Sequence, residues 1–298
     1  MKILITGGCG HIGSYLIRTL VRQKITVVDN MSSQRYCSLF DLPTKIKFIE
    51  KDIDDITIDE LKQHDTVIHL AAITDAAGSF GNKEQIENVN IEKTKALIDK
   101  CEEAKISKFI FPSSTSVYGV STDVVYEDDE SYVNPQSPYA ESKIIIENYL
   151  KTKKLNHIIF RFGTIFGFSE GMRFHTAVNK FCYQSSINEP ITIWEQNYNQ
   201  VRPYLGLRDC YQAIRMGLDG IIPSGTYNVL SENKKLSDIV KILKSHNSEL
   251  KIDFVDTPLL NQYSYDVSDS KIKECGFRRV DKLKNTIPGI LNRLYYLK

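Results

Sequence analysis

The 298-residue sequence lacks an excess of either charge, a long apolar run and any paired arrangement of cysteines. Its 38 basic and 37 acidic side chains leave a net charge of +1, which gives no electrostatic reason to expect a nucleic-acid or membrane partner. Because no apolar run approaches the roughly 20 residues that span a bilayer, we predict no transmembrane helix. The six cysteines show neither C-x-x-C nor Cys/His ligand spacing, so we expect free thiols and no metal site.

The sequence also lacks the features that divide a chain into separate units. No linker rich in Gly, Pro or Ser, no internal repeat and no low-complexity segment is present. A strand is predicted from the second residue onward, which leaves no room ahead of it for a secretory signal, and we expect a cytoplasmic protein. Two lobes that share a cleft fit this organisation best.

What the sequence does have is a glycine-rich turn near its start. Residues 2–6 read as a buried strand, and Gly7, Gly10 and Gly13 follow with G-x-x-G-x-x-G spacing before a helical pattern. Such glycines permit a tight turn, close approach of a pyrophosphate and close packing of the helix, whose free amides attract phosphate. A glycine triplet alone is also typical of an ordinary strand-to-helix turn, so the rest of the chain must decide.

An acidic residue ends the second predicted strand. This strand covers residues 25–29, and its last residue, Asp29, lies sixteen positions beyond Gly13. A carboxylate there can accept hydrogen bonds from both ribose hydroxyls of adenosine and would repel a 2′-phosphate, which favours NAD over NADP. The alternative is a carboxylate that caps the end of the strand, and nearby Arg35 could still hold a 2′-phosphate.

Strands and helices alternate along the first half of the chain, as they do in a doubly wound parallel sheet. There we predict strands at 47–50, 66–72, 108–111 and 156–161 and a long helix at 82–101. In the second half the alternation is less regular, which indicates a smaller lobe. Its predicted elements are helices at 172–185, 209–218, 236–245 and 281–294 and strands at 191–194 and 227–230.

A tyrosine and a lysine are spaced to share one face of a helix. Ser137 and Pro138 form a good helix start, and Tyr139 and Lys143 follow at i and i+4. A nearby ammonium stabilises a phenolate, so we expect Lys143 to lower the pKa of the Tyr139 phenol and suit it to exchange protons near neutral pH. An ordinary amphipathic helix is the alternative, but a serine-rich strand end about 25 residues upstream favours the catalytic interpretation.

Together these pieces resemble the extended short-chain dehydrogenase/reductase family, and within it the nucleotide-sugar epimerases and dehydratases. The resemblance implies a Rossmann-type doubly wound parallel sheet in an NAD-binding domain, residues 1–165, and a smaller C-terminal α/β substrate lobe, residues 166–298. It also implies a homodimer through a four-helix bundle of helices 82–101 and 139–150. The motifs that carry it are Thr6–Gly13, Asp29-Asn30, Asp52-Ile53, Leu70–Ala72, Asn88-Val89, Ser113–Gly119, Tyr139–Lys143 and Arg161–Gly163.

Individual roles are implied by the same resemblance. Tyr139 would exchange a proton with the sugar, Ser114 would bond the reacting sugar oxygen, and Lys143 would bond the nicotinamide ribose. The implied cofactor-binding residues are Gly7, Gly10, Ile12, Gly13, Asp29, Asn30, Asp52, Ile53, Leu70, Ala71, Ala72, Asn88, Tyr139 and Lys143. The implied substrate-binding residues are Thr115, Thr164, Arg173, His175 and Arg202.

The sequence departs from the family at positions that bear on the reaction. Sugar 4,6-dehydratases resembling this chain carry a carboxylic acid just after the catalytic hydroxyl, whereas Thr115 and Ser116 stand here, so we expect no 4,6-dehydratase activity. Thr164 replaces a frequent asparagine, and residues 255–263 lack an expected arginine, which leaves Arg202 to bind the diphosphate. His175 could transfer a proton or only bond the substrate, and we assign it to substrate binding.

The leading interpretation is an NAD-dependent nucleotide-sugar epimerase that acts through a transient 4-keto sugar. An NAD(P)-dependent nucleotide-sugar 4-dehydrogenase or 4-keto reductase is the first alternative. An enzyme for an unusual deoxy or heptose sugar is another. A regulator that binds NAD without turnover is the alternative from a different class.

Overall fold

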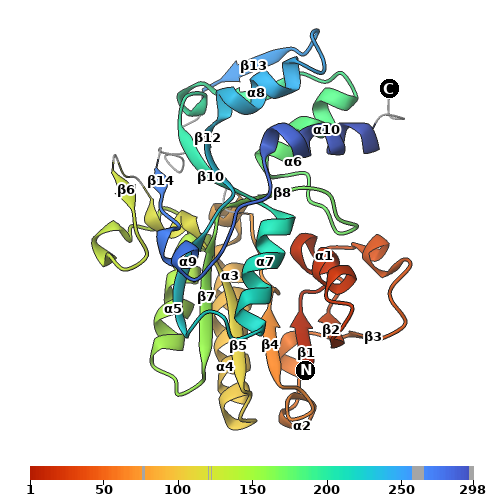
Figure 1. Cartoon of the computed structure of the whole chain (residues 1–298), viewed down its shortest axis with the longest axis vertical. Helices are drawn as coiled ribbons and strands as arrows, with labels where there is room; N and C mark the ends of the chain where they lie inside the picture. Colours follow the sequence, from red (N-terminus) through yellow and green to blue (C-terminus); the bar gives the residue numbers. More distant parts are fainter. Residues whose placement is uncertain (76–77, 120, 122, 257–264, 295–298) are drawn as a thin grey trace.

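The structure is a computed structural model that describes residues 1–75, 78–119, 121, 123–256 and 265–294. A seven-stranded sheet lies at its centre, and every pairing in that sheet is parallel (Figure 1). The strands, in spatial order, are β11 (Gly225–Val229), β7 (His157–Phe162), β5 (Lys108–Ser114), β4 (Thr66–His69), β1 (Lys2–Thr6), β2 (Lys24–Asp29) and β3 (Ile46–Glu50).

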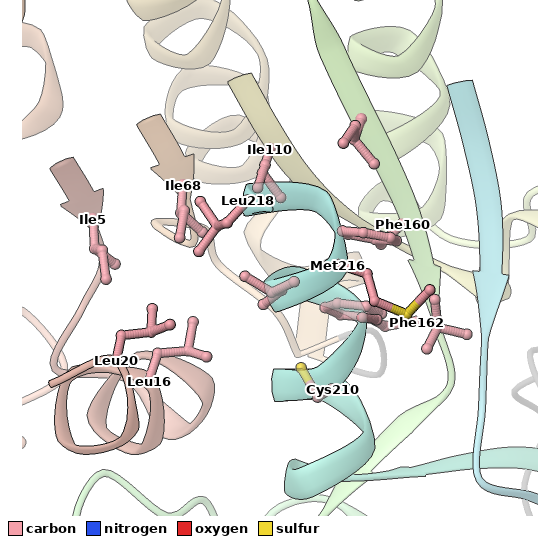
Figure 2. Close-up of a cluster of buried hydrophobic side chains, with 14 of the residues drawn as sticks. Ile5, Leu16, Leu20, Ile68, Ile110, Phe160, Phe162, Cys210, Met216 and Leu218 are labelled. Carbon is pink, nitrogen blue, oxygen red and sulfur yellow. The ribbon is translucent and has the colours of Figure 1, made fainter. Parts of the chain in front are cut away.

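Helices cover both faces of this sheet. On one face, α1 (His11–Thr19) and α7 (Leu207–Leu218) pack onto strand residues such as Ile5 and Phe160, as Figure 2 shows. On the other face, α4 (Thr94–Glu103), α5 (Pro138–Lys151) and the short α2 (Ile58–Leu61) pack onto residues such as Leu4. Strands buried on both faces read as continuous apolar runs, which explains the composition of β1. The predicted doubly wound fold class is confirmed.

The predicted long helix at 82–101 is not one regular α-helix. It consists of α3 (Lys83–Ile86), a π-helical segment (Glu87–Lys93) and α4. The wider π turn leaves Asn88 exposed and turns Asn90 inward, where its amide accepts from the Ile73 amide at 2.8 Å and donates to the Ile73 carbonyl at 2.9 Å. Periodicity alone gives no sign of such a turn, which is common near functional sites.

The second half of the chain builds a smaller unit beside the sheet (Figure 1). Its core gathers apolar residues from three helices and three strands, among them Phe181, Leu243 and Ile287. Its helices are α6 (Ala177–Ser186), α8 (Leu236–Lys244) and α10 (Leu283–Arg293). Its strands are β8 (Thr164–Phe166), β9 (Ile191–Trp194), β10 (Val201–Gly206), β12 (Glu232–Lys235) and β13 (Ile252–Val255).

The chain crosses back to the large sheet after entering this unit. Helix α7 and strand β11 both follow residue 166, yet α7 packs against the sheet and β11 pairs with β7. Helix α9 (Ser270–Glu274) lies close to β11, and the short strands β6 (Val124–Val125) and β14 (Asp266–Val267) pair with each other. The strand predicted at 227–230 in the smaller lobe is therefore an edge strand of the large sheet.

One predicted strand is shorter than expected. The strand predicted at 66–72 ends at His69, and residues 70–72 leave the sheet as a loop.

Among the described residues, no helix combines the length and the apolar character that a membrane span requires.

Candidate active site

The glycine turn forms a cradle, a space along the backbone that a side chain at Gly7 or Gly13 would fill. Gly7 has φ +67°, and a Cβ added there would lie 2.5 Å from the Ala71 amide nitrogen. A Cβ on Gly13 would lie 2.5 Å from the Gly8 Cα, so only glycine lets helix α1 approach the turn this closely. No side chain caps the start of α1 and its first turn holds no acidic residue, so its amides fit an anionic pyrophosphate.

His11 turns away from this cradle. Its Nε2 lies 2.8 Å from the Gly167 carbonyl oxygen, and the ring joins α1 to the second half of the chain. Burial lowers the pKa of His11 to about 4, so the ring is neutral near neutral pH. His11 therefore ties together the two halves of the molecule.

Asp29 lies at the end of β2, beside the glycine turn. Its two carboxylate oxygens accept from the backbone amides of Cys9 at 3.0 Å and Met31 at 2.9 Å. The carboxylate thus caps the local backbone, and because each oxygen has a second lone pair, it can also accept from a ribose. Arg35 donates to the Gly171 carbonyl at 2.7 Å, so its guanidinium is held by the second half of the chain.

The residues expected around adenine gather at the neighbouring strand ends. Asn30 donates to the Asp52 carboxylate at 2.9 Å, and Ile53 is buried beside them. Lys93 lies 3.1 Å from the same carboxylate. Although partial burial opposes the effect, the hydrogen bonds from Asn30 and Lys93 lower the pKa of Asp52 to about 2. Asp52 is therefore ionised here and can accept a hydrogen bond from an adenine amino group.

Ser114, Tyr139 and Lys143 come together at the carboxyl end of the sheet. Ser114 is the last residue of β5, and its side chain lies near enough to the Tyr139 phenol, at the start of α5, to lower the pKa of that phenol. Ser116 donates to the Ser114 hydroxyl from its amide at 3.2 Å and from its hydroxyl at 2.9 Å. The Lys143 Nζ donates to the Pro112 carbonyl at 3.0 Å and lies 5.7 Å from the centre of the Tyr139 ring.

The electrostatics of this corner differ from the expectation that Lys143 lowers the pKa of the phenol. Burial raises the pKa of Tyr139, while the Arg173 charge and the Ser114 hydrogen bond act in the opposite direction. Burial also lowers the pKa of Lys143 to about 8, with Glu147 opposing it. For Tyr139, burial outweighs the opposing effects of Arg173 and Ser114, while the Lys143 ammonium donates to the Pro112 carbonyl. The phenol of the free protein is thus protonated at neutral pH, and it must lose this proton before it can accept one from a sugar hydroxyl.

The residues predicted to bind substrate come from several parts of the fold. The Arg173 Nε lies 3.4 Å from the Nδ1 of exposed His175, and its charge reaches Tyr139. Thr164 pairs with Tyr204 in β8 and β10. Thr115 is buried, and its hydroxyl donates to a backbone carbonyl, that of Phe162, at 3.3 Å.

Two polar atoms at the start of β10 (Val201–Gly206) are buried without a partner among the described residues. They are the Arg202 Nη2, a donor, and the Gln200 Oε1, an acceptor. Orphaned buried groups cost stability, so a ligand that satisfies them gains affinity. We did not predict Gln200 from the sequence; it lies just before β10, two residues ahead of Arg202. Of the predicted segment 255–263, residues 257–263 lie outside the described residues.

Comparisons with known proteins agree with this geometry. Residues 3–229 match the NAD dependent epimerase/dehydratase family. The dTDP-D-glucose 4,6-dehydratase of Bos taurus is 29% identical over 301 residues, which cover 93% of this chain and 84% of that protein. The UDP-glucuronic acid 4-epimerase of Bacillus cereus, solved with UDP-glucuronic acid and NAD, is 25% identical over the whole of both chains, with a TM-score of 0.91. The UDP-glucose 4-epimerase of Thermus thermophilus shares the fold, with a TM-score of 0.87 at 21% identity over 99% of each chain.

The family match spans well over half of the chain and includes the glycine turn, Ser114, Tyr139 and Lys143. It confirms the predicted kinship with the extended short-chain dehydrogenases, the predicted enzyme class and the predicted cofactor, NAD. The chain belongs to the NAD-dependent epimerase/dehydratase family.

Proposed function

We propose that this protein is an NAD-dependent nucleotide-sugar epimerase that acts through a transient 4-keto sugar. The observation that carries the proposal is the corner of Ser114, Tyr139 and Lys143, placed at the carboxyl ends of the strands beside the glycine turn. NAD supplies a hydride acceptor, and in reduced form a donor, when it is bound. Tyr139 accepts the proton of the sugar hydroxyl and later returns it, and Ser114 orients that oxygen.

The substrate side supports a nucleotide sugar. Arg202 has a buried donor without a described partner, as a site for a diphosphate oxygen would have. Thr115, Thr164, Arg173 and His175 remain proposed substrate contacts. Similar solved structures are 4-epimerases in complex with UDP-sugars, which supports the same substrate class.

A sugar 4,6-dehydratase is the second candidate, because the bovine relative has that activity in its name. Such a reaction must remove a proton from C5 and water across C5 and C6, which needs an ionisable acid and base. Thr115 and Ser116 occupy the positions after Ser114, and their hydroxyls bond Phe162 and Ser114. Since hydroxyls do not ionise near neutral pH, we propose that the enzyme does not dehydrate its substrate.

One assay separates the remaining alternatives. Purified protein with NAD is incubated with UDP-, GDP-, CDP- and dTDP-sugars while the absorbance of reduced nicotinamide is followed and the sugars are separated by chromatography. An epimer formed without net reduced cofactor supports the proposal. Stoichiometric reduced nicotinamide indicates a 4-dehydrogenase, and added reduced cofactor consumed by a 4-keto sugar indicates a reductase. NAD binding without turnover of any sugar indicates a regulator.

We further propose a cytoplasmic homodimer and a division into lobes near residue 165. The helices predicted for the four-helix bundle, α4 and α5, lie against each other, and Tyr149 donates to Asp99 between them at 2.7 Å. Ile145 on α5 is exposed, as an interface residue is in a single chain. Ile145→Asp should convert a dimer into a monomer in light scattering. A wild-type protein that is already monomeric would contradict the dimer.

A further inference from the structure

A buried carboxylate lies beneath the catalytic corner without belonging to it. Glu147 is one turn beyond Lys143 on α5, and its side chain is completely buried. It accepts from the Arg161 Nη2 at 2.6 Å and from the Arg161 Nε at 3.1 Å, and it also accepts from the Ser113 hydroxyl. A single carboxylate thus joins helix α5 to strands β5 and β7.

The network continues to the edge of the sheet. Arg161 donates to the Tyr118 hydroxyl at 3.0 Å, and that hydroxyl donates to the Asn228 side chain at 2.6 Å. Asn228, on β11, donates in turn to Glu127 at 3.0 and 3.1 Å. Although burial opposes it, the Glu147 hydrogen bonds and charge raise the pKa of Arg161, which keeps the guanidinium charged. Every step of the chain is a satisfied buried bond, which makes such a network rigid.

The position of Glu147 relates directly to the catalytic groups. Tyr139, Lys143 and Glu147 recur every four residues and so share one face of α5. Ser113, which donates to Glu147, is the neighbour of Ser114 in β5. A shift of Glu147 would therefore move the phenol and the ammonium relative to the Ser114 hydroxyl.

Glu147 also sets the charge around Lys143. From α5, Lys143 faces Tyr139 and Glu147, and from β5 it faces the Phe111 ring at 4.7 Å and the Pro112 carbonyl at 3.0 Å. The elements around it also bring buried His69 from β4 and Arg161 from β7. Glu147 is the charged group that favours the ammonium form, against burial.

We propose that Glu147 is a positioning residue that fixes α5 on β5 and β7, aligns Ser114, Tyr139 and Lys143, and supplies the negative charge that keeps Lys143 an ammonium. The proposal rests on the proposed epimerase function for its effect on turnover, but its effect on Lys143 needs no substrate. It predicts that Glu147 acts on catalysis without contacting the sugar.

Glu147→Gln is the first test. Because catalysis is sensitive to small displacements, we expect kcat to fall about 10- to 100-fold while KM for the nucleotide sugar stays within a few-fold. Loss of the negative charge should also move the alkaline limb of the pH profile about one pH unit lower. Glu147→Asp keeps the charge, so it should lose kcat but retain the wild-type pH limb. Glu141→Gln makes the same change on the exposed face of α5 and should change neither quantity.

The second measurement is the affinity for NAD alone as a function of pH, by calorimetry. Wild-type affinity should weaken above about pH 8 as Lys143 loses its proton, and Glu147→Gln should shift that midpoint lower. If Glu147→Gln fails to fold because Arg161 is left unpaired, Glu147→Gln/Arg161→Gln removes both charges and is measured instead. A folded variant with the wild-type midpoint would overturn the proposal, even if no sugar is ever turned over. A shifted midpoint without turnover would instead refute only the epimerase function.

Discussion

The two sides of the candidate site are built differently. On the catalytic side, the side chains of Ser114 and Lys143 each have a hydrogen bond within the protein, and the polar groups beneath them are joined to one another. On the proposed substrate side, Arg202 and Gln200 each have a buried polar atom without a partner in the described part of the chain. The catalytic side is therefore preorganised, whereas the proposed substrate side has polar atoms whose hydrogen bonds a ligand can supply.

This difference separates the two determinants of the reaction. A preorganised corner lowers the barrier of a step that is common to the family, because its groups need no rearrangement. Open donors and acceptors are satisfied only by a ligand of matching shape and charge, so they select the sugar. We therefore expect substitutions on the catalytic side to change kcat and substitutions on the substrate side to change KM.

Tyr139→Phe, on the catalytic side, should have the largest effect on activity. It removes the transferring proton, so kcat should fall by about 10²- to 10⁴-fold, while NAD affinity stays within a few-fold. Steady-state kinetics and NAD calorimetry measure the two quantities. Tyr126→Phe, at an exposed tyrosine, is the matched control. A Tyr139→Phe enzyme with a near-wild-type rate would remove Tyr139 from the mechanism.

Lys143→Met should make the protein more stable although it lowers activity. Burial lowers the Lys143 pKa from 10.5 to about 8, so the charge destabilises the folded state at every pH below 8. Methionine removes that cost, and we expect a gain of up to about 3 kcal/mol at pH 7. The gain should shrink as the pH rises from 8 to 10.5, because over this range Lys143 is neutral in the folded wild-type protein. Urea unfolding across this range measures it, and a variant less stable than wild type at pH 7 would show that burial of Lys143 is not costly.

Arg202→Met should act mainly on substrate affinity. Loss of a charged hydrogen bond to the diphosphate should lower kcat/KM by about 10- to 100-fold, mostly through KM. Stability should not fall, because the variant also removes a buried donor that has no described partner. Arg22→Met, at an exposed arginine, is the control. A large drop in kcat with unchanged KM would place Arg202 on the catalytic side.

Acidification should weaken the fold through its buried neutral histidines. Burial lowers the pKa of His69 to about 3 and that of His11 to about 4, and His69 lies between Thr6 at 2.7 Å and Thr94 at 3.0 Å. Since the unfolded chain takes up these protons below about pH 6.5, stability should fall by about 2 kcal/mol per histidine between pH 6.5 and 5. Denaturant titrations measure the slope. His246→Gln, at an exposed histidine, should leave the slope unchanged, whereas a flat wild-type profile would contradict the buried neutral state.

Much of the fold could be predicted from the sequence, because glycine spacing, strand composition and helix periodicity are local signals. The strands ending at Asp29 and in the serine-rich loop lie close to where they were predicted. The π-helical turn, which leaves Asn88 exposed and buries Asn90, could not be predicted, because no residue type that breaks a helix marks its position. The return of β11 to the large sheet is a long-range pairing that leaves no local pattern.

The site was predictable in its residues and less so in its electrostatics. The motif spacing predicted that Ser114, Tyr139 and Lys143 act together, and the structure brings them near one another, while their roles stay a prediction. The predicted direction of the Tyr139 pKa shift was wrong. The shift depends on the burial of the phenol and on the orientation of the Lys143 ammonium, and the spacing of the two residues specifies neither. Gln200 and Glu147 escaped notice for the same reason, since their roles depend on what surrounds them.

The most direct test of the proposed reaction is proton NMR of the purified enzyme with NAD and a UDP-sugar in D₂O. Hydride transfer to bound NAD and back returns the original hydrogen to C4, so the account predicts a C4 epimer with no deuterium on any carbon and an intact C6 hydroxyl. A product that has gained deuterium at C5 and lost the C6 oxygen would show dehydration and would contradict the account.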